Sequence, residues 1–186
     1  IAYIDGTLAV ASPVQNDVLM HLMVWALDIG EYQYALRIAE YALLNGLVMP
    51  EPYARDTATI FAEQLADGLI EDPNVATHAD LIAKAIDLVR GCDMVDQARA
   101  KLYKAQGLAL AAYRPSEAIT AYEMALRLDA KVGVKQILDK LKRDMGKHAD
   151  PESSRDAPSG SQDTSGTPAA PAADPASTAH SSGAGE

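Results

Sequence analysis

The stretch that decides the fold is Trp25-Ala-Leu-Asp-Ile-Gly-Glu-Tyr-Gln-Tyr-Ala-Leu-Arg-Ile-Ala-Glu-Tyr-Ala-Leu-Leu-Asn-Gly-Leu-Val-Met-Pro50. Apolar residues recur at helical spacing on both sides of Gly30, with Val18, Leu22 and Trp25 before it and Ala35, Ile38, Ala39 and Ala42 after it. Gly30 can adopt the left-handed conformation that ends a helix, and Asn45-Gly46 can end the next helix in the same way. The stretch predicts a helical hairpin, and because two helices this apolar are not stable alone, later segments should pack on them.

Helix caps and breakers divide the rest of the chain into further helices. Alanine and leucine dominate and the alternation of β-branched residues is nearly absent, which favours an all-helical domain. Ser12-Pro13, Thr77 and Asp93 are suitable helix starts, whereas Asp72-Pro73 and Tyr113-Arg-Pro115 interrupt the pattern. The expected helices cover about 13–28, 31–45, 53–71, Thr77 to 90, 94–112, 116–129 and 134–146, and residues 1–11 are either an irregular lead-in or the end of a lost helix.

Composition divides the chain into two regions. Residues 149–186 are crowded with Pro, Ser, Ala, Gly and Thr and contain no aromatic residue, Leu, Ile or Val, so nothing would offset the entropy of ordering them. The chain starts at Ile1, without Met or a signal-peptide pattern, which suggests a fragment. We therefore expect an N-terminally truncated helical domain over 1–147 and a disordered tail over 148–186.

Two segments resemble tetratricopeptide units. The first segment, Gly30-Glu-Tyr followed by Ala35 and Ala39, resembles the turn and second helix of such a unit, with glycine and alanine at the close contacts. The second segment has Gly107, Ala118, Tyr122 and Ala125 at similar places. Small residues let paired helices approach closely. The two segments are about 80 residues apart, whereas a tetratricopeptide array repeats about every 34 residues. This spacing favours a bundle of antiparallel helical hairpins with tetratricopeptide-like pairs, and a peptide-binding scaffold is kept as an alternative.

Charge is distributed unevenly along the chain. Residues 1–97 contain 4 basic and 15 acidic side chains, a net −11, whereas residues 98–149 contain 11 and 5, a net +6. If the chain meets nucleic acid, the basic block is the candidate, because cations there can pair with phosphates. The candidate DNA-binding residues are Lys101, Lys104, Arg127, Lys131, Lys135, Lys142 and Arg143. In the alternative interpretation these cations balance the acidic half, within one bundle or between neighbouring subunits.

Motifs for catalysis or cofactor binding are missing. The sequence has no glycine-rich phosphate loop and no Gly-x-Ser-x-Gly, and its four histidines, His21, His78, His148 and His180, are not paired at the spacing of a helical zinc site. Cys92 is the single cysteine, so an intrachain disulfide is impossible and an intracellular setting is favoured. No window is apolar over the roughly 18 residues needed to span a membrane, so the chain should be soluble. We expect no cofactor, metal or catalytic residue.

Two acidic patterns in the sequence are possible metal sites. Glu63, Asp67 and Glu71 are four residues apart and would line one helix face, where carboxylates can attract a divalent cation but are usually just solvated. Asp129-Ala-Lys131 fits the Asp/Glu-x-Lys fragment of metal-dependent nucleases. In those nucleases the fragment lies on a strand, whereas here it falls at a helix end, so a chance match is favoured.

Several segments together resemble a known family. They are Gln15-Asn-Asp-Val-Leu-Met20, Val24-Trp25, Asp28-Ile-Gly30, Ala35-Leu-Arg-Ile-Ala-Glu-Tyr-Ala42, Gly46-Leu-Val-Met-Pro50, Asp93-Met94 and Ala98-Arg-Ala-Lys-Leu-Tyr-Lys104. Over about residues 1–146 the chain is similar to the M-type small terminase subunit of P-two-like temperate tailed phages. The quoted positions are hydrophobic and turn residues, so no catalytic residue can be transferred from the family.

The resemblance implies a role in packaging viral DNA in the host cytoplasm. Members of the family recognise the cohesive-end site and work with a large ATPase subunit, and small subunits generally act as oligomeric regulators. The implied partners are viral double-stranded DNA, the large terminase subunit and further copies of the chain, with no membrane. The family is also called the terminase endonuclease subunit, so an alternative is that this chain cuts DNA itself.

Overall fold

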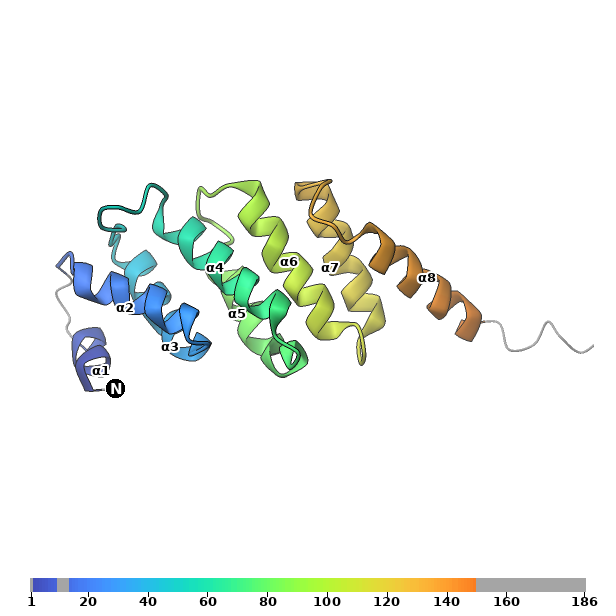
Figure 1. The fold of residues 1–186 in the computed structure, drawn as a ribbon, viewed down its shortest axis with the longest axis horizontal. Helices are drawn as coiled ribbons and strands as arrows, with labels where there is room; N and C mark the ends of the chain where they lie inside the picture. Colours follow the sequence, from blue (N-terminus) through green and yellow to red (C-terminus); the bar gives the residue numbers. More distant parts are fainter. Residues whose placement is uncertain (1, 10–13, 150–186) are drawn as a thin grey trace, which may run out of the picture. The chain divides into compact units, whose positions relative to one another are not determined.

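The computed structural model describes residues 2–9 and 14–149, with the side chains of the last two left out. Every regular element in these ranges is helical (Figure 1). The elements are α1 (Ala2–Leu8), α2 (Asp17–Asp28), α3 (Tyr32–Leu44), α4 (Thr57–Glu71), the 3-10 helix η1 (Val75–His78), α5 (Ala79–Leu88), α6 (Asp96–Leu110), α7 (Pro115–Leu128) and α8 (Lys135–Ala149). The all-α prediction is confirmed, and the predicted tail, apart from the backbone of its first two residues, lies outside the described residues.

Helix starts differ from the predicted ones because other side chains cap them. The Asn16 side chain accepts a hydrogen bond from the backbone N–H of Leu19 at 3.0 Å, so α2 begins at Asp17, while the expected cap Ser12-Pro13 lies outside the described ranges. Asp56 accepts from the backbone N–H of Thr59 at 2.8 Å and starts α4 later than expected. These carboxamide and carboxylate oxygens satisfy N–H groups that have no partner within the helix.

Two other local predictions are wrong. The Thr77 hydroxyl donates to the carbonyl of Asn74 at 2.8 Å inside η1, so it does not cap α5. Asp93 does not cap α6 either, since that helix begins at Asp96 after Val95 and has no side-chain cap. Residues 2–8 form helix α1, in which Ile4 is buried, so this segment follows the helical one of its two predicted alternatives and not the irregular lead-in.

Helix α2 with α3, and helix α6 with α7, pack as antiparallel hairpins (Figure 1). Helix α2 packs on α3, α4 packs on α6, α6 pairs with α7, and α8 packs on α7. Gly30 and Gly46 have φ of 80° and 67°, which is the left-handed conformation expected at the ends of α2 and α3. Neither glycine can be replaced by a residue with a Cβ without strain. The hairpin predicted around Gly30 is therefore present.

Two groups of buried side chains hold the helices together. The larger group joins α1 to α6 and includes Phe61, Leu65 and Ile38, all fully buried. The smaller group joins the end of α6 to α7 and α8 and is centred on Tyr122. None of the described helices combines the length and the hydropathy that crossing a lipid bilayer requires.

The inner face of α2 differs from the predicted one. Trp25 is 59% exposed and Val18 is 58% exposed, although both belong to the apolar positions at helical spacing that predicted the hairpin. Leu19, Met20 and Met23 are fully buried instead. Helix α2 is apolar on more than one face, so helical spacing alone did not identify the side that turns inward.

Candidate nucleic-acid interface

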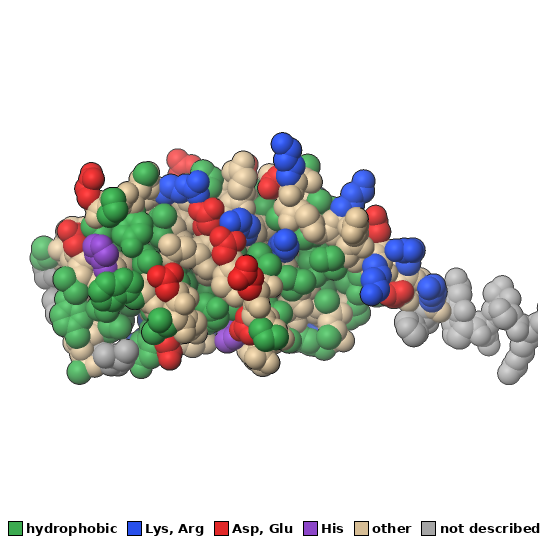
Figure 2. All heavy atoms as spheres, viewed as in Figure 1, with side chains coloured by type: hydrophobic (Ala, Val, Ile, Leu, Met, Phe, Trp, Pro, Cys, Tyr) green, Lys and Arg blue, Asp and Glu red, His purple; other side chains and the backbone are tan. Residues whose placement is uncertain are grey.

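Basic side chains concentrate on the last helices. In Figure 2, Lys and Arg side chains gather over α8, whereas Asp and Glu side chains are prominent over the earlier helices. Helix α8 carries Lys135, Lys140, Lys142, Arg143 and Lys147 on an exposed surface. The separation of charge along the sequence therefore persists as a separation between elements of the fold, and it marks α8, with the turn that precedes it, as the basic surface.

The turn between α7 and α8 brings four of the predicted DNA-binding residues to one place. The Asp129 carboxylate accepts a hydrogen bond from the backbone N–H of Lys131 at 2.8 Å, which shapes the turn. The Lys104 ammonium donates to the carbonyl of Val132 at 3.1 Å, so this α6 side chain ends at the same turn. Two further cations, Arg127 and Lys135, lie on the flanking helix ends. We name Lys104, Arg127, Lys131 and Lys135 the turn cluster.

The turn cluster retains cations that no acidic group neutralises. Arg127, Lys131 and Lys135 are exposed, and their side chains make no hydrogen bond or ion pair with any described residue. Lys140 shares both properties, and the sequence-based selection of candidates omitted it although it lies in the same basic block. Unpaired, exposed cations can contact an anion without first giving up an internal partner.

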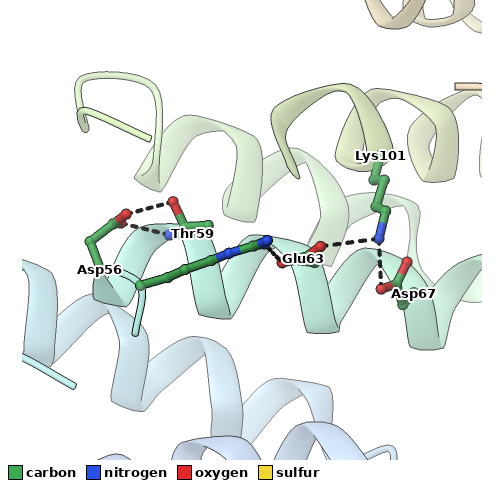
Figure 3. Close-up of polar contacts among 6 residues, drawn as sticks. Asp56, Thr59, Glu63, Asp67 and Lys101 are labelled. Atoms are coloured by element: carbon green, nitrogen blue, oxygen red, sulfur yellow. Dashed lines mark hydrogen bonds and ion pairs between the residues drawn. The ribbon is translucent and has the colours of Figure 1, made fainter. Parts of the chain in front are cut away.

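Lys101, another predicted DNA-binding residue, pairs inside the molecule. Figure 3 shows it reaching from α6 to α4, where its ammonium lies 2.8 Å from Asp67 and 3.4 Å from Glu63. Burial opposes the charged form of Lys101, but these two carboxylates outweigh it and raise the pKa of the ammonium. Lys101 therefore stays protonated and ties two helices together.

The last two predicted DNA-binding residues lie on α8. The Lys142 ammonium pairs with Glu123 of α7 at 2.6 Å, and the Arg143 Nε donates to the carbonyl of Asp139 at 3.2 Å. Both side chains are exposed, so water competes with these contacts and holds them weakly. Their contact with DNA stays a prediction, as it does for Lys101 and the turn cluster.

The acidic row on α4 is compensated by basic side chains. Glu63 pairs with Arg55 as well as with Lys101, and Asp67 shares the Lys101 ammonium. Among the residues that the structure describes, no three His, Cys, Asp or Glu side chains converge as metal ligands. Asp129 is engaged in the α7–α8 turn, and its fragment with Lys131 lies at a helix end, as expected. Glu63 and Asp67 therefore form ion pairs on the surface of α4, whereas Asp129 shapes a turn.

The remaining candidates for chemistry make structural contacts. The His21 ring lies 5.8 Å from the Tyr53 ring, and His78 contacts Asp72 at 3.2 Å. Cys92 is half-buried, with its sulfur 3.9 Å from the carbonyl of Leu88.

Arg99 of α6 has a structural role that was not predicted from the sequence, since its side chain donates hydrogen bonds to backbone carbonyls after α5. Nothing in its local sequence pattern separates it from the other basic side chains of α6.

Comparisons with known proteins agree with the resemblance seen in the sequence. Residues 1–97 match the model of the phage small terminase subunit. The chain is also 32% identical over 155 residues to the terminase endonuclease subunit of Escherichia phage P2, which covers 82% of this chain and 63% of that relative. The chain thus spans less than two thirds of the relative's length, and no solved structure matches it. Since the family model covers more than half of its residues, this chain belongs to the phage small terminase subunit family.

Proposed function

We propose that this terminase chain recognises cohesive-end DNA during packaging and recruits or regulates the large subunit that carries the motor. Membership of the family supports the packaging role. The observation that carries the DNA-binding part is the turn cluster, where three exposed cations have no partner among the described residues. Contacts of this kind attract the phosphate backbone and release counterions, so they supply affinity and position the protein on the duplex.

A charge-removal experiment tests the DNA-binding part. In the triple variant Arg127→Gln, Lys131→Gln, Lys135→Gln, the affinity for a cohesive-end duplex should fall. If all three cations contact phosphates, the slope of log K against log salt should become less steep by up to about 2.7, since each contact contributes about 0.9. Fluorescence anisotropy at four NaCl concentrations measures both quantities.

The matched control removes the same charge from the acidic half. The variant Arg37→Gln, Lys84→Gln, Arg90→Gln also loses three cations, all on exposed residues of other elements. It should bind with nearly the wild-type salt slope. Equal losses in the two triple variants would mean that net charge alone governs binding, and the proposed contact surface would be wrong.

We also propose that the chain associates with copies of itself and with the large subunit. Exposed apolar side chains support self-association, because water-exposed apolar groups of this size favour contact with a partner. Light scattering with and without the duplex measures the association of the chain with copies of itself. Co-purification with the large subunit measures the second, and a chain that is monomeric and binds neither DNA nor the large subunit would contradict the adaptor role.

The name of the P2 relative supports a second candidate, in which this chain itself is the nuclease. The test is cleavage of cohesive-end DNA by the purified chain with magnesium. Under the adaptor proposal, cutting requires the large subunit. Cleavage by the chain alone that is lost in Glu63→Ala or Asp129→Ala, with the fold intact by circular dichroism, would favour the nuclease.

A further inference from the structure

Helix α2 presents an apolar surface that the described part of the chain leaves uncovered. Val14, Val18, Trp25 and Ile29 are 75%, 58%, 59% and 75% exposed. Their spacing of four, seven and four residues places them along one side of the helix and its flanks. In Figure 2, hydrophobic side chains gather over this region. We name these four residues the α2 stripe.

The aromatic residue of the α2 stripe is already held in place. The Trp25 ring lies 6.5 Å from the His21 ring, which in turn lies 5.8 Å from the Tyr53 ring. An exposed tryptophan supported by neighbouring rings loses little conformational entropy when a partner covers it. Tryptophan at the centre of an apolar patch is typical of the residues that dominate the energy of protein interfaces.

Composition and charge exclude two candidate partners for the α2 stripe, namely the chain's own tail and the α2 stripe of a second copy. The tail beyond residue 149 contains no Leu, Ile, Val, Met or aromatic residue, so it cannot supply an apolar counterpart. Two copies meeting stripe to stripe would bring like charges together, because residues 2–49 carry five acidic side chains and one basic. The surface that covers the α2 stripe should therefore be apolar and carry basic side chains.

Helix α8 has both properties. Over residues 135–147 it carries five basic and two acidic side chains. Ile137 is 38% exposed, and Leu141 and Met145, which follow at intervals of four residues, are half-buried, with Leu141 partly covered by the smaller group of buried side chains. These three residues form the α8 edge. In the series of packed helices, α2 packs on α3 and α4 whereas α8 packs on α7, so the stripe and the edge lie at opposite ends of the series (Figure 1).

We propose that the α2 stripe of one copy docks against the α8 edge of a second copy. The proposal rests on the self-association proposed above and names its two surfaces. Apolar contact supplies the affinity, and the pairing of an acidic with a basic end selects the partner surface and excludes the stripe-to-stripe contact. Because the two surfaces differ, each docked copy still offers one free surface of each kind. Such a head-to-tail contact propagates into a ring or an open chain.

Light scattering of the full chain and of two charge-introducing variants tests this pairing. Trp25→Glu damages the stripe and Ile137→Glu damages the edge, and both side chains are exposed enough for the fold to survive. Each variant alone should be monomeric. An equimolar mixture should form a dimer and nothing larger, because only one intact stripe and one intact edge meet. Tyr113→Glu, 49% exposed and outside both surfaces, should assemble like the wild type.

Other outcomes of the light-scattering experiment distinguish the stripe-to-edge contact from the more general proposal that the chain self-associates. If Ile137→Glu still assembles while Trp25→Glu does not, the stripe pairs with itself, and the proposed edge is wrong although self-association stands. If Trp25→Glu assembles like the wild type, the stripe is not the interface. A wild-type chain that stays monomeric at all concentrations overturns self-association as well, whereas the DNA-binding role is decided independently by anisotropy of the turn-cluster variant.

Discussion

At the scale of single residues, Gly107 of α6 leaves room for the ring of Tyr122 of α7 to pack against it. A Cβ added at Gly107 would lie 2.3–2.7 Å from three atoms of the Tyr122 ring, which is fully buried. The ring cannot move aside without disturbing the core between α6 and α7. We expect Gly107→Ala to lower the free energy of unfolding by about 1–3 kcal/mol, the usual cost of overpacking a core. Urea unfolding followed by circular dichroism measures the loss.

Gly146→Ala provides the matched control for this substitution. Gly146 lies in α8, and an added Cβ would meet nothing within 4 Å. Alanine is the better helix former by about 1 kcal/mol, so this variant should be at least as stable as the wild type. If Gly107→Ala behaved like Gly146→Ala, the close approach of α6 and α7 would not exist.

Tyr122 also makes stability depend on pH. Its hydroxyl is buried without a hydrogen-bond partner among the described residues, and burial raises its pKa from 10.0 to about 12. Between these values the unfolded chain binds fewer protons than the folded one, so the free energy of unfolding falls as pH rises from 10 to 12. The loss should be on the order of 2 kcal/mol, since one pKa unit corresponds to about 1.4 kcal/mol.

Tyr122→Phe isolates this contribution. The variant keeps the ring and loses the unpaired hydroxyl, so at neutral pH it should be at least as stable as the wild type. Urea unfolding at pH 9 and pH 12 should show a smaller loss than in the wild type, with some loss remaining because burial also raises the pKa of Tyr32. An unchanged pH dependence would show that Tyr122 ionises as readily in the fold as outside it.

Conformation at single residues was easier to predict than burial. Gly30 and Gly46 were identified from sequence because left-handed helix ends restrict the residue locally. The exposure of Trp25 was not identified, since the choice between two apolar faces of α2 depends on where α3 and α4 pack. Val18 and Trp25, two of the four residues of the α2 stripe, were therefore counted among the apolar positions that predicted the hairpin.

At the scale of elements, Arg99 connects the end of α5 to α6. Its guanidinium donates to the carbonyls of Val89 at 3.1 Å, Arg90 at 3.4 Å and Cys92 at 2.9 Å. These contacts satisfy carbonyls that the end of a helix leaves without partners. Arg99→Met keeps much of the side-chain volume and removes the donors, so the free energy of unfolding should fall by about 1.5–3 kcal/mol.

Arg127→Met is the control for Arg99. Arg127 is exposed and makes no hydrogen bond or ion pair with a described residue, so its loss should leave stability nearly unchanged and weaken DNA binding. Thermal unfolding and anisotropy of both variants give four values to compare. Equal destabilisation in the two variants would show that the three carbonyl contacts of Arg99 contribute nothing.

The elements were predicted more accurately than the contacts between them. The helices from α2 to α8 follow from local periodicity and breakers, and the main errors arose at helix starts, as at α2 and α4, where Asn16 and Asp56 provide caps, and at α5 and α6, where Thr77 and Asp93 do not. The ion pairs of Lys101 join residues 34 and 38 positions apart. A local sequence pattern does not reveal contacts between residues so far apart in the chain. Lys101 and Arg127 were therefore predicted alike as DNA-binding residues, although Lys101 is ion-paired in the structure and Arg127 is not.

At the scale of the whole molecule, the two groups of buried side chains share α6. Ala98, Leu102 and Ala105 of α6 belong to the larger group, whereas Leu110 at its end belongs to the smaller one. Helices that contact only their neighbours in a series open locally before the whole molecule unfolds. Helix α8 contacts α7, so loosening the smaller group should release α8 and the turn cluster first.

Hydrogen exchange can detect this local opening. Leu138 is 5% exposed in the smaller group and Phe61 is fully buried in the larger one, so alanine at either position should cost several kcal/mol, about 2–5 for Leu138 and about 3–5 for Phe61. In Leu138→Ala, faster amide exchange should be confined to α7 and α8, and DNA binding should weaken while α2 to α5 keep wild-type protection. In Phe61→Ala, protection should fall from α2 through α6. If both variants lost amide protection uniformly over all helices, the described domain would open as one unit. The turn cluster could then not be released separately from the acidic half.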